Sequence, residues 1–444
     1  MKKRKVVALF LLLFAIAGSF AVFPASSSAI DSINIAAQYA ILVEPASGEI
    51  LCEKNADVQA SPASLTKIMT ALIAFEKADF SEYATVTSSA LADLHPESSI
   101  ADLKVDEEIL IDDLVKCILV ASANDACNVL AEHLFGSIDA FVAEMNRRAA
   151  ELGCTGTQFK NTHGLTEEGH YTTARDMYII TLEALKHQQF LEICNTASLV
   201  IPKTNKAGER TFLSTNHLIS RLKSPDYVYY YAKGIKTGHT SDAGYCLVSS
   251  AEKDGVFLLS VVMGSVLDSE TGKMMSFVDT KNLFEWGFSN FSHQTMLSAG
   301  DAVAELAVRL SSESDYVVLV PEESISALLP NDFNKAEVVL KKDLFKGGEV
   351  DAPVVKGDIL GRVTVEYKGV EYQTVNLIAL NSLKLDKMLY YSANIKEFLS
   401  QRWIIFAVLG LFALILLYVI IVVLYNRRRR DKRRKNVHYN SRRR

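Results

Sequence analysis

A serine and a lysine stand three positions apart at Ser64 and Lys67, within the stretch Pro62-Ala63-Ser64-Leu65-Thr66-Lys67. In a helix, side chains three positions apart share a face, so the lysine amine can reach the serine hydroxyl. A serine hydroxyl is a weak nucleophile until an adjacent base takes its proton. An amine can be that base when burial and a second cation hold it neutral part of the time. The pair therefore predicts nucleophilic catalysis by Ser64, with Lys67 as its base.

Two further motifs would complete such a site. Ser122-Ala123-Asn124 supplies a second hydroxyl and an amide, and Lys236-Thr237-Gly238 supplies the second cation. Taken singly, each motif has a structural explanation: an exposed lysine on a helix, a cap at a helix end, or a turn at a strand edge. Together they are specific, because their order, their separations of about 58 and about 114 residues, and their expected helix, loop and strand settings agree.

The hydrophobic pattern predicts the helices that must position these motifs. Ser61-Pro62 should open a buried helix with a broad apolar stripe, because proline is tolerated at an early helix position. Ser64 would lie in its first turn, where free N–H groups and the helix dipole favour developing negative charge. A second apolar helix is expected over 111–120, ending near Ser122, and a third over 138–152.

Strands and one more helix complete the expected architecture. Apolar runs and turn residues predict strands over 37–43, 231–237, 244–251 and 256–263, and a closing helix over 277–288. This mixture predicts an α/β/α layered (α+β) catalytic domain, which we place at 30–290. From about Ser292, short strands alternate with turns, at 317–320, 336–340, 359–366 and 372–380. They predict a small all-β, sandwich-like domain over 293–387.

The N-terminus has the pattern of a secretory signal peptide. The basic residues Lys2 to Lys5 precede an almost unbroken apolar run over 6–22, and Ser27-Ser28-Ala29 offers small residues for cleavage. We expect residues 1–29 to be removed. An uncleaved membrane anchor is the alternative, although the apolar run is short for a span.

The C-terminus has the pattern of a transmembrane helix. Residues 403–424 carry no charge, and 22 helical residues reach about 33 Å, which matches a hydrocarbon core of about 30 Å. The basic tail 425–444 follows, with Arg427 to Arg430 at its start, and the positive-inside rule predicts that it is cytoplasmic. The body 30–402 would then lie outside the cytoplasm, held at the cell membrane by this single span, with 388–402 as a juxtamembrane linker.

Composition limits the other possibilities. The chain has 444 residues with Lys+Arg 47 against Asp+Glu 52, and basic residues gather at its two ends. The body is therefore acidic and a poor nucleic-acid binder, because phosphate contacts need clustered Lys and Arg. The nine histidines form no HExxH pattern or tight cluster, so we expect no metal and no cofactor. The six cysteines could be free or bridged: Cys52, Cys117, Cys127, Cys154, Cys194 and Cys246.

With these motifs in place, the chain resembles a low-molecular-mass penicillin-binding protein of the serine-type D-alanyl-D-alanine carboxypeptidase family. The resemblance covers about residues 33–390 and includes Ala56 to Thr70, Asn161 to Leu165, Tyr171 to Asp176, Lys233 to Thr240, Ala243 to Tyr245, Ala352-Pro353, Gly357 and Gly361. It implies a serine β-lactamase/penicillin-binding-protein-like fold, followed by the family's C-terminal β domain. The family usually ends in an amphipathic helix on the membrane, whereas this chain has a full span.

The resemblance also implies roles in acyl transfer. It makes Ser64 the acylated nucleophile and Lys67 its base. Ser122 would relay a proton to the leaving D-alanine, and Asn124 would orient Lys67 and the substrate amide. The backbone N–H groups of Ser64 and His239 would form the oxyanion hole.

Substrate binding is expected along the third motif. Lys236 and Thr237 would hold the terminal carboxylate, with Gly238 and His239 in the same substrate-binding segment. The family often adds an arginine near this carboxylate, for which Arg210 and Arg221 are candidates.

Another pair, Arg175 and Asp176, fits a structural ion pair better than a catalytic one.

The expected activity is removal of the terminal D-alanine from peptidoglycan pentapeptide stems, with β-lactams as covalent inhibitors. Two enzyme alternatives on the same scaffold are a β-lactamase and a D,D-endopeptidase. We find no clear counterpart of the glutamate that class A β-lactamases use for deacylation, and the middle motif is SAN where those enzymes usually carry SDN. A membrane-tethered wall-binding protein without activity is the non-enzyme alternative, and the intact motifs argue against it.

Overall fold

The computed structural model of the chain describes residues 33–92, 94–95 and 98–441. The described residues form two compact units, one of 33–294 with 327–333 and the other of 295–326 with 334–441. The predicted signal peptide, residues 1–29, lies outside the described residues.

A five-stranded antiparallel sheet forms the centre of the first unit. Its order is β2-β1-β9-β8-β7, with bounds β1 Tyr39–Glu44, β2 Glu49–Lys54, β7 Lys236–Thr240, β8 Gly244–Lys253 and β9 Val256–Ser265. The central strands β8 and β9 are buried along most of their length, which explains why apolar residues occupy consecutive positions in both. The predicted strand 231–237 is corrected, because β7 begins only at Lys236 and lies at the sheet edge.

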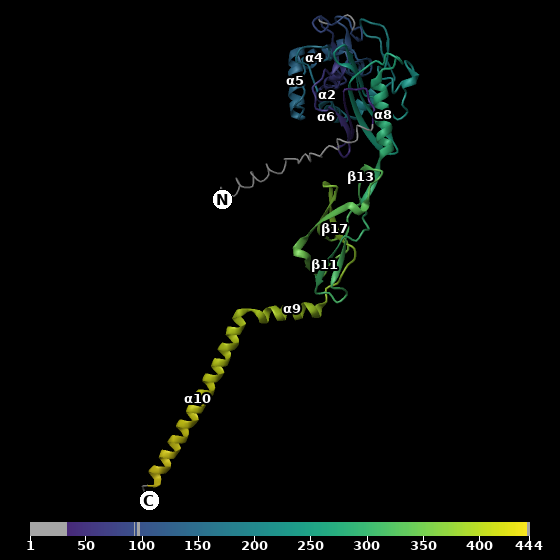
Figure 1. The fold of residues 1–444 in the computed structure, drawn as a ribbon. Helices are drawn as coiled ribbons and strands as arrows, with labels where there is room; N and C mark the ends of the chain where they lie inside the picture. Colours follow the sequence, from purple (N-terminus) through teal and green to yellow (C-terminus); the bar gives the residue numbers. More distant parts are fainter. Residues whose placement is uncertain (1–32, 93, 96–97, 442–444) are drawn as a thin grey trace. The chain divides into compact units, whose positions relative to one another are not determined.

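Helices cover both faces of this sheet (Figure 1). On one side lie α2 (Lys67–Lys77), α4 (Asn124–Phe135), α5 (Ile138–Glu151) and α6 (Ala174–Ala184), and on the other lies α8 (Met275–Asn290). The two shorter helices of this unit are α3 (Ile111–Lys116) and α7 (Gln188–Cys194).

Each sheet face contributes to its own hydrophobic core. Ile41 and Val43 of β1 belong to the larger core with α2 and α4, whereas Leu42 packs with Phe284 of α8. Successive strand residues point to opposite faces, so a sheet buried on both sides needs apolar residues at consecutive positions. The layered α/β/α arrangement predicted from the sequence is confirmed.

Two short antiparallel pairs lie outside the main sheet. Strands β3 (Tyr83–Thr85) and β4 (Glu108–Leu110) form one pair, and β5 (Ser198–Ile201) and β6 (Arg210–Leu213) form the other. Both pairs lie in parts of the chain for which the hydrophobic pattern predicted no strands. Residues between β3 and β4, and residues just after β6, line the cleft described below.

The second unit is built on β-strands, which confirms the predicted all-β domain. Its six-stranded sheet has the order β14-β16-β17-β12-β11-β15. The bounds of these strands and of two more, β10 and β13, are β10 Phe291–Leu297, β11 Ala304–Arg309, β12 Tyr316–Pro321, β13 Ile325–Pro330, β14 Val338–Leu344, β15 Glu349–Asp351, β16 Ile359–Tyr367 and β17 Val370–Ala379.

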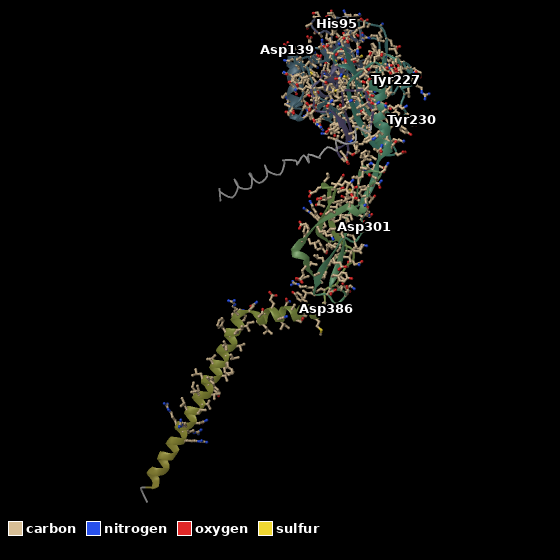
Figure 2. The ribbon with its side chains drawn as sticks, viewed as in Figure 1. His95, Asp139, Tyr227, Tyr230, Asp301 and Asp386 are labelled. Carbon is tan, nitrogen blue, oxygen red and sulfur yellow. The ribbon has the colours of Figure 1, made fainter. Side chains whose placement is uncertain are left out.

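Two helices follow the β-strands. Helix α9 (Lys387–Ser400) is capped by the Asp386 carboxylate, which accepts hydrogen bonds from the amides of Met388 and Leu389. Helix α10 (Arg402–Ser441) contains a stretch, 402–430, that is long and apolar enough to cross a membrane. Side chains along α9 and the first part of α10 project freely (Figure 2), and the apolar stretch is not buried within the protein.

The six cysteines are free thiols, and each of them is buried. The question left open by the sequence is therefore settled in favour of unbridged cysteines packed as small apolar residues.

Candidate active site

Ser64 and Lys67 lie at a junction between two helical forms. Ser64 belongs to a short 3-10 helix, η2 (Ala63–Thr66), and Lys67 is the first residue of α2. The expectation that Ser64 lies in the first turn of an α-helix is corrected accordingly. Lys67 Nζ donates a hydrogen bond of 2.7 Å to Ser64 Oγ, and the Lys67 side chain is fully buried beneath the half-buried serine.

A strained backbone turn holds this serine in place. Ala63 has a φ of +46°, and the carbonyl of Ala63 faces Gly164 so closely that a Cβ at Gly164 would lie 1.8 Å from its oxygen. Thr66 Oγ1 donates to the same carbonyl at 2.9 Å. A residue with left-handed backbone persists only when its surroundings hold it there, and functional sites often contain such strain.

His170 supports the same turn through Thr66. The Lys160 amide donates to His170 Nδ1 at 3.0 Å, so this nitrogen carries no proton and Nε2–H donates to Thr66 Oγ1 at 2.9 Å. Burial lowers the pKa of His170 to about 4, which keeps the ring neutral at physiological pH. The resulting chain of hydrogen bonds runs from Lys160 through His170 and Thr66 to the Ala63 carbonyl.

The environment of Lys67 favours its neutral form. Burial lowers the Lys67 pKa to about 8, against smaller opposing effects of Cys127 and Asp125. At pH 7 a group with that pKa is neutral in roughly one molecule in ten. Lys67 Nζ also donates to the His163 carbonyl at 2.8 Å, a contact that the sequence did not reveal.

Lys236 is the second buried amine of the site. Burial, and then the charge of Lys67, hold its pKa well below the ordinary value for a lysine. Its Nζ donates to the Thr237 carbonyl at 2.9 Å. The sequence suggested Lys236 as the cation that keeps Lys67 neutral, but the two buried charges repel each other and Lys236 is itself driven toward the neutral form.

The middle motif lies between two helical segments. Ser122 follows a π-helical turn, η3 (Cys117–Ala121), and has a left-handed φ of 62°. Asn124 starts α4, and its backbone N–H donates to the Ser99 carbonyl at 2.8 Å. Both side chains are almost fully buried and both line the cleft.

Strand β7 forms the opposite wall. A Cβ at Gly238 would lie 3.1 Å from the Ser64 nitrogen, so glycine allows this strand to approach the nucleophile turn. Thr237 Oγ1 donates to Thr215 Oγ1 at 2.6 Å. The next residue, His239, lines the cleft with its ring against Tyr245, the two ring centroids 4.2 Å apart.

These elements enclose a cleft of about 890 Å³. Six of the predicted site residues line it: Ser64, Ser122, Asn124, Thr237, Gly238 and His239. Lys67 and Lys236 are buried behind that lining. Sequence reasoning missed Ser98, Ser99, Thr215 and His217 because they lie outside the three motifs, in segments without a strong pattern.

The predicted arginines occupy other places. Arg210 forms an ion pair with the buried Glu107, and the described cleft lining contains neither Arg210 nor Arg221. Arg175 pairs with Glu53 and Asp57 rather than with Asp176, so the expected ion pair is wrong in its partner.

Asp176 instead accepts hydrogen bonds from the Gly156 amide and the Thr157 hydroxyl. Its contacts are those of a residue that braces the fold.

Comparison with known proteins identifies the family. The sequence model of the D-alanyl-D-alanine carboxypeptidase family, Peptidase S11, matches residues 25–266, and that of the C-terminal domain of penicillin-binding protein 5 matches residues 291–385. The D-alanyl-D-alanine carboxypeptidase DacF of Bacillus subtilis is 32% identical, over 75% of this chain and 82% of its own length. DacA of Haemophilus influenzae is 30% identical, over 79% and 86%.

Solved structures agree with the sequence relatives. Penicillin-binding protein 5 from Haemophilus influenzae superposes with a TM-score of 0.59 at 30% identity, covering 79% of this chain and 98% of its own. The peptidoglycan synthesis regulatory factor PBP3 from Streptococcus pneumoniae gives a TM-score of 0.63 at 25% identity, covering 79% of this chain and 100% of its own. The Ser64–Lys67 pair, the two flanking motifs and these likenesses together show that the chain belongs to the D-alanyl-D-alanine carboxypeptidase family of low-molecular-mass penicillin-binding proteins.

Proposed function

We propose that this protein is a serine D-alanyl-D-alanine carboxypeptidase that removes the terminal D-alanine from peptidoglycan pentapeptide stems. The observation that carries the proposal is the 2.7 Å hydrogen bond between Lys67 Nζ and Ser64 Oγ, at the wall of a cleft that the other two motifs also border. A buried amine with a pKa of about 8 is suited to take a proton from a serine near neutral pH.

Acylation is the first half of the reaction. Ser64 Oγ attacks the carbonyl carbon of the penultimate D-alanine, and its proton passes to Lys67 Nζ. The amides of Ser64 and His239 receive the oxyanion, a type of contact that contributes about 3–4 kcal/mol. As the C–N bond breaks, Ser122 gives its hydroxyl proton to the leaving nitrogen and takes the proton held by Lys67 Nζ, so Lys67 is neutral again when free D-alanine departs from the Ser64 ester.

Deacylation reverses the proton path. A water molecule attacks the ester carbonyl while Lys67 takes its proton, and the Ser64 oxygen regains a proton as the C–O bond breaks. The shortened stem peptide leaves with a new terminal carboxylate, and the enzyme returns to its starting state.

Substrate binding would change the charge on Lys236. The terminal carboxylate binds Lys236 and Thr237, and an adjacent anion favours the protonated form of Lys236. The carboxylate and the Lys236 ammonium then form an ion pair in which each charge offsets the other.

The same chemistry makes the protein a target of β-lactams, whose strained amide would acylate Ser64. The test is mass spectrometry of the folded protein after incubation with benzylpenicillin. We expect one adduct mapped to Ser64, slow release of it, and loss of both adduct and D-alanine release in Ser64→Ala. Folded protein without an adduct would contradict the proposal, and release within seconds would indicate a β-lactamase.

We also propose the following domain organisation and topology. Residues 1–29 are cleaved, the catalytic domain 30–290 and the β domain 293–387 lie outside the cell membrane, and 388–402 lead into a single span over 403–424. The apolar stretch within α10 supports this proposal, and the basic tail 425–444 would be cytoplasmic. A protease added to intact protoplasts should digest the body and spare a C-terminal tag; digestion of the tag would contradict this orientation.

A further inference from the structure

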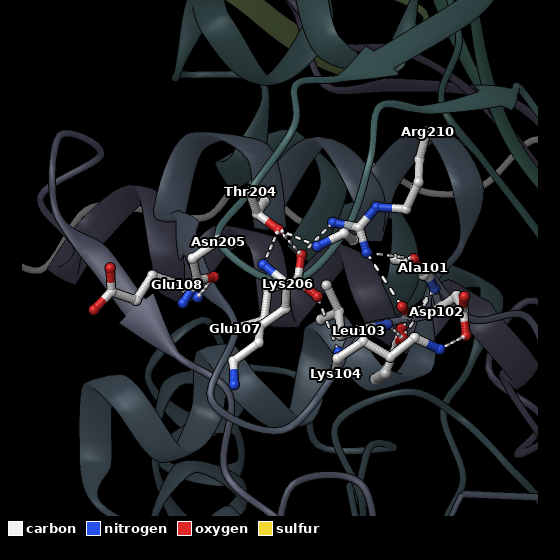
Figure 3. A network of polar contacts seen from close by, with 12 residues as sticks. Ala101, Asp102, Leu103, Lys104, Glu107, Glu108, Thr204, Asn205, Lys206 and Arg210 are labelled. Carbon is white, nitrogen blue, oxygen red and sulfur yellow. Dashed lines mark hydrogen bonds and ion pairs between the residues drawn. The ribbon is translucent and has the colours of Figure 1, made fainter.

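Arg210 stands outside the cleft but binds Ala101 and Asp102, which closely follow the lining residues Ser98 and Ser99 in the chain. Its guanidinium forms an ion pair with Glu107, and its Nη1 donates to the carbonyl oxygens of Ala101 and Asp102 at 3.0 and 3.2 Å. Figure 3 shows the guanidinium directed at both groups at once. Glu107 is fully buried, and only 13% of the Arg210 side chain is exposed.

Glu107 closes this arrangement on the other side. Its carboxylate accepts hydrogen bonds from the Lys104 amide at 2.9 Å and from Thr204 Oγ1 at 2.9 Å. The chain from Ala101 to Lys104 is therefore held at its carbonyl groups by Arg210 and at its end by Glu107. We call Arg210, Glu107 and residues 101–104 the Arg210 clamp.

The clamp is joined directly to the middle motif. The Asp125 carboxylate accepts hydrogen bonds from the amides of Ala101 and Leu103, at 2.8 to 3.1 Å, and Asp125 follows Asn124 at the start of α4. The Asn124 backbone N–H donates in turn to the carbonyl of Ser99, a residue that lines the cleft. Any shift of segment 101–104 would be transmitted to Asn124 and to Ser122 two residues before it.

The clamp also reaches the opposite wall. Arg210 is the first residue of β6, and the chain continues from that strand to Thr215. The Thr215 amide donates to the Val120 carbonyl at 3.3 Å, and the Thr215 hydroxyl accepts the hydrogen bond from Thr237. The largely buried Arg210 guanidinium thus connects residues 101–104 with strand β6. Just after that strand, Thr215 accepts the hydrogen bond from Thr237 of the carboxylate-binding motif.

From these contacts we infer that Arg210 is a positioning residue of the reaction, which sets the place of Ser122 relative to Ser64 through the clamp. The inference rests on the proposed function. A planar guanidinium can bind a carboxylate and two carbonyl groups at fixed angles, whereas a lysine ammonium keeps the charge but loses this fork. Arg210→Lys should therefore leave a folded protein in which Ser122 is misplaced.

The readout uses the leaving group. Ser122 is needed to protonate a leaving amine, but a thiolate departs without a proton because its pKa is low. We compare kcat/KM for diacetyl-Lys-D-Ala-D-Ala with kcat/KM for an analogue whose scissile nitrogen is replaced by sulfur. Active sites are counted by penicillin titration, so loss of folded protein does not affect the comparison.

We expect Arg210→Lys to lower kcat/KM at least about tenfold on the peptide and less than about threefold on the thioester, because misplacement of an acid affects only the step that needs it. Arg148→Lys is the matched control. Arg148 is 17% exposed and bridges Glu76 and Glu183 in the same unit, yet its contacts do not reach the cleft lining. It should leave both values within about twofold of wild type.

A second variant covers the possibility that Arg210→Lys does not fold. Arg210→Met combined with Glu107→Leu removes both buried charges together, which avoids an uncompensated ion. This double variant should show the same selective loss on the peptide. Two results in the variants that fold would overturn the clamp. One is a kcat/KM equal to the wild-type value on both substrates, and the other is a loss of kcat/KM of the same size on both.

Ser122→Ala separates the two levels of the argument. If it slows both substrates equally, the proton-relay role in the proposed function fails and the inference falls with it. If Ser122→Ala discriminates between the substrates and the Arg210 variants do not, only the clamp is overturned.

Discussion

Gly164 lies against the carbonyl oxygen of Ala63, and a Cβ at Gly164 would come within 1.8 Å of that oxygen. Ala63 directly precedes Ser64, and residue 163 supplies the carbonyl that binds Lys67. Two segments about a hundred residues apart therefore share responsibility for the geometry of the nucleophile. The contact explains why a glycine with a φ of +91° is needed at this position.

Gly164→Ala should displace both the Ala63 turn and the His163 carbonyl. We expect the second-order rate of acylation by a fluorescent penicillin to fall by about 100-fold, since small misplacements of reacting groups are costly. The free energy of unfolding should fall by about 1–3 kcal/mol or more, as for other overpacked sites. Stopped-flow fluorescence and urea unfolding measure the two effects.

Gly153→Ala is the control for that substitution. Gly153 has a similar φ of +80°, but no atom lies within 4 Å of its added Cβ. It should lose stability from backbone strain, of about 1 kcal/mol, and keep the wild-type acylation rate. Equal acylation by both glycine variants would contradict the importance of the Ala63–Gly164 contact.

The pH dependence of acylation should follow the titration of Lys67. Burial lowers the pKa of this amine to about 8, so the neutral base becomes more abundant as the pH rises toward and through 8. We expect the acylation rate of the free enzyme by penicillin to rise from pH 6 and to level above pH 8. A rate that is flat between pH 6 and 9 would exclude Lys67 as the titrating base.

The burial of the Lys67 amine should also lower the free energy of unfolding at neutral pH. Because its folded-state pKa is below the ordinary value of 10.5, the unfolded chain binds more protons between pH 8 and 10.5. The free energy of unfolding therefore rises with pH across that window, and the part due to Lys67 is about 3 kcal/mol in total. Urea unfolding of wild type and Lys67→Met should show the wild type gaining relative to the variant as the pH rises; a constant difference would contradict this.

His170 should make the protein sensitive to acid. Burial lowers its pKa from 6.5 to about 4, so the unfolded chain binds the extra proton first as the pH falls below 6.5. Stability from this residue is lost between pH 6.5 and 4. His170→Gln should have a lower Tm than wild type at pH 7 but a smaller further decrease at pH 4.5, measured by calorimetry. Parallel decreases in both proteins would indicate that another group titrates.

Lys236 should matter most for substrates that carry a carboxylate. Lys236→Met removes the cation expected to pair with the terminal D-alanine, so kcat/KM for diacetyl-Lys-D-Ala-D-Ala should fall by about 100-fold or more. The peptide in which the terminal carboxylate is an amide should be a poor substrate of the wild type and be affected little by the variant. Similar losses on both peptides would argue against a carboxylate contact.

Removal of the C-terminal helices should separate anchoring from catalysis. A chain that ends at Asp386 keeps the bridge between Val354 and Leu383 and lacks α9 and α10. We expect it to leave the membrane fraction and to keep the wild-type kcat/KM on a soluble peptide, because the cleft residues belong to the other unit. Retention in washed membranes would show a second anchor.

The sequence by itself determined the features that depend on local geometry. The three-residue separation of Ser64 and Lys67 puts both groups on one side of a helical turn, whether 3-10 or α. The apolar pattern located strands β1, β8 and β9, helix α8 and the long apolar stretch of α10, because burial and membrane insertion select for runs of apolar residues. Local patterns were weaker at the edge strand β7, whose start at Lys236 they placed too early.

Only the tertiary structure decided which distant groups meet. The partners of Arg210 and Arg175 lie about a hundred residues away in the sequence, so no local spacing could distinguish a carboxylate-binding arginine from a structural one. The same is true of Thr215 beside Thr237 and of the His163 carbonyl on Lys67. The protonation of the two lysines was equally undetermined, because a pKa depends on burial and neighbouring charge, which arise when the chain packs.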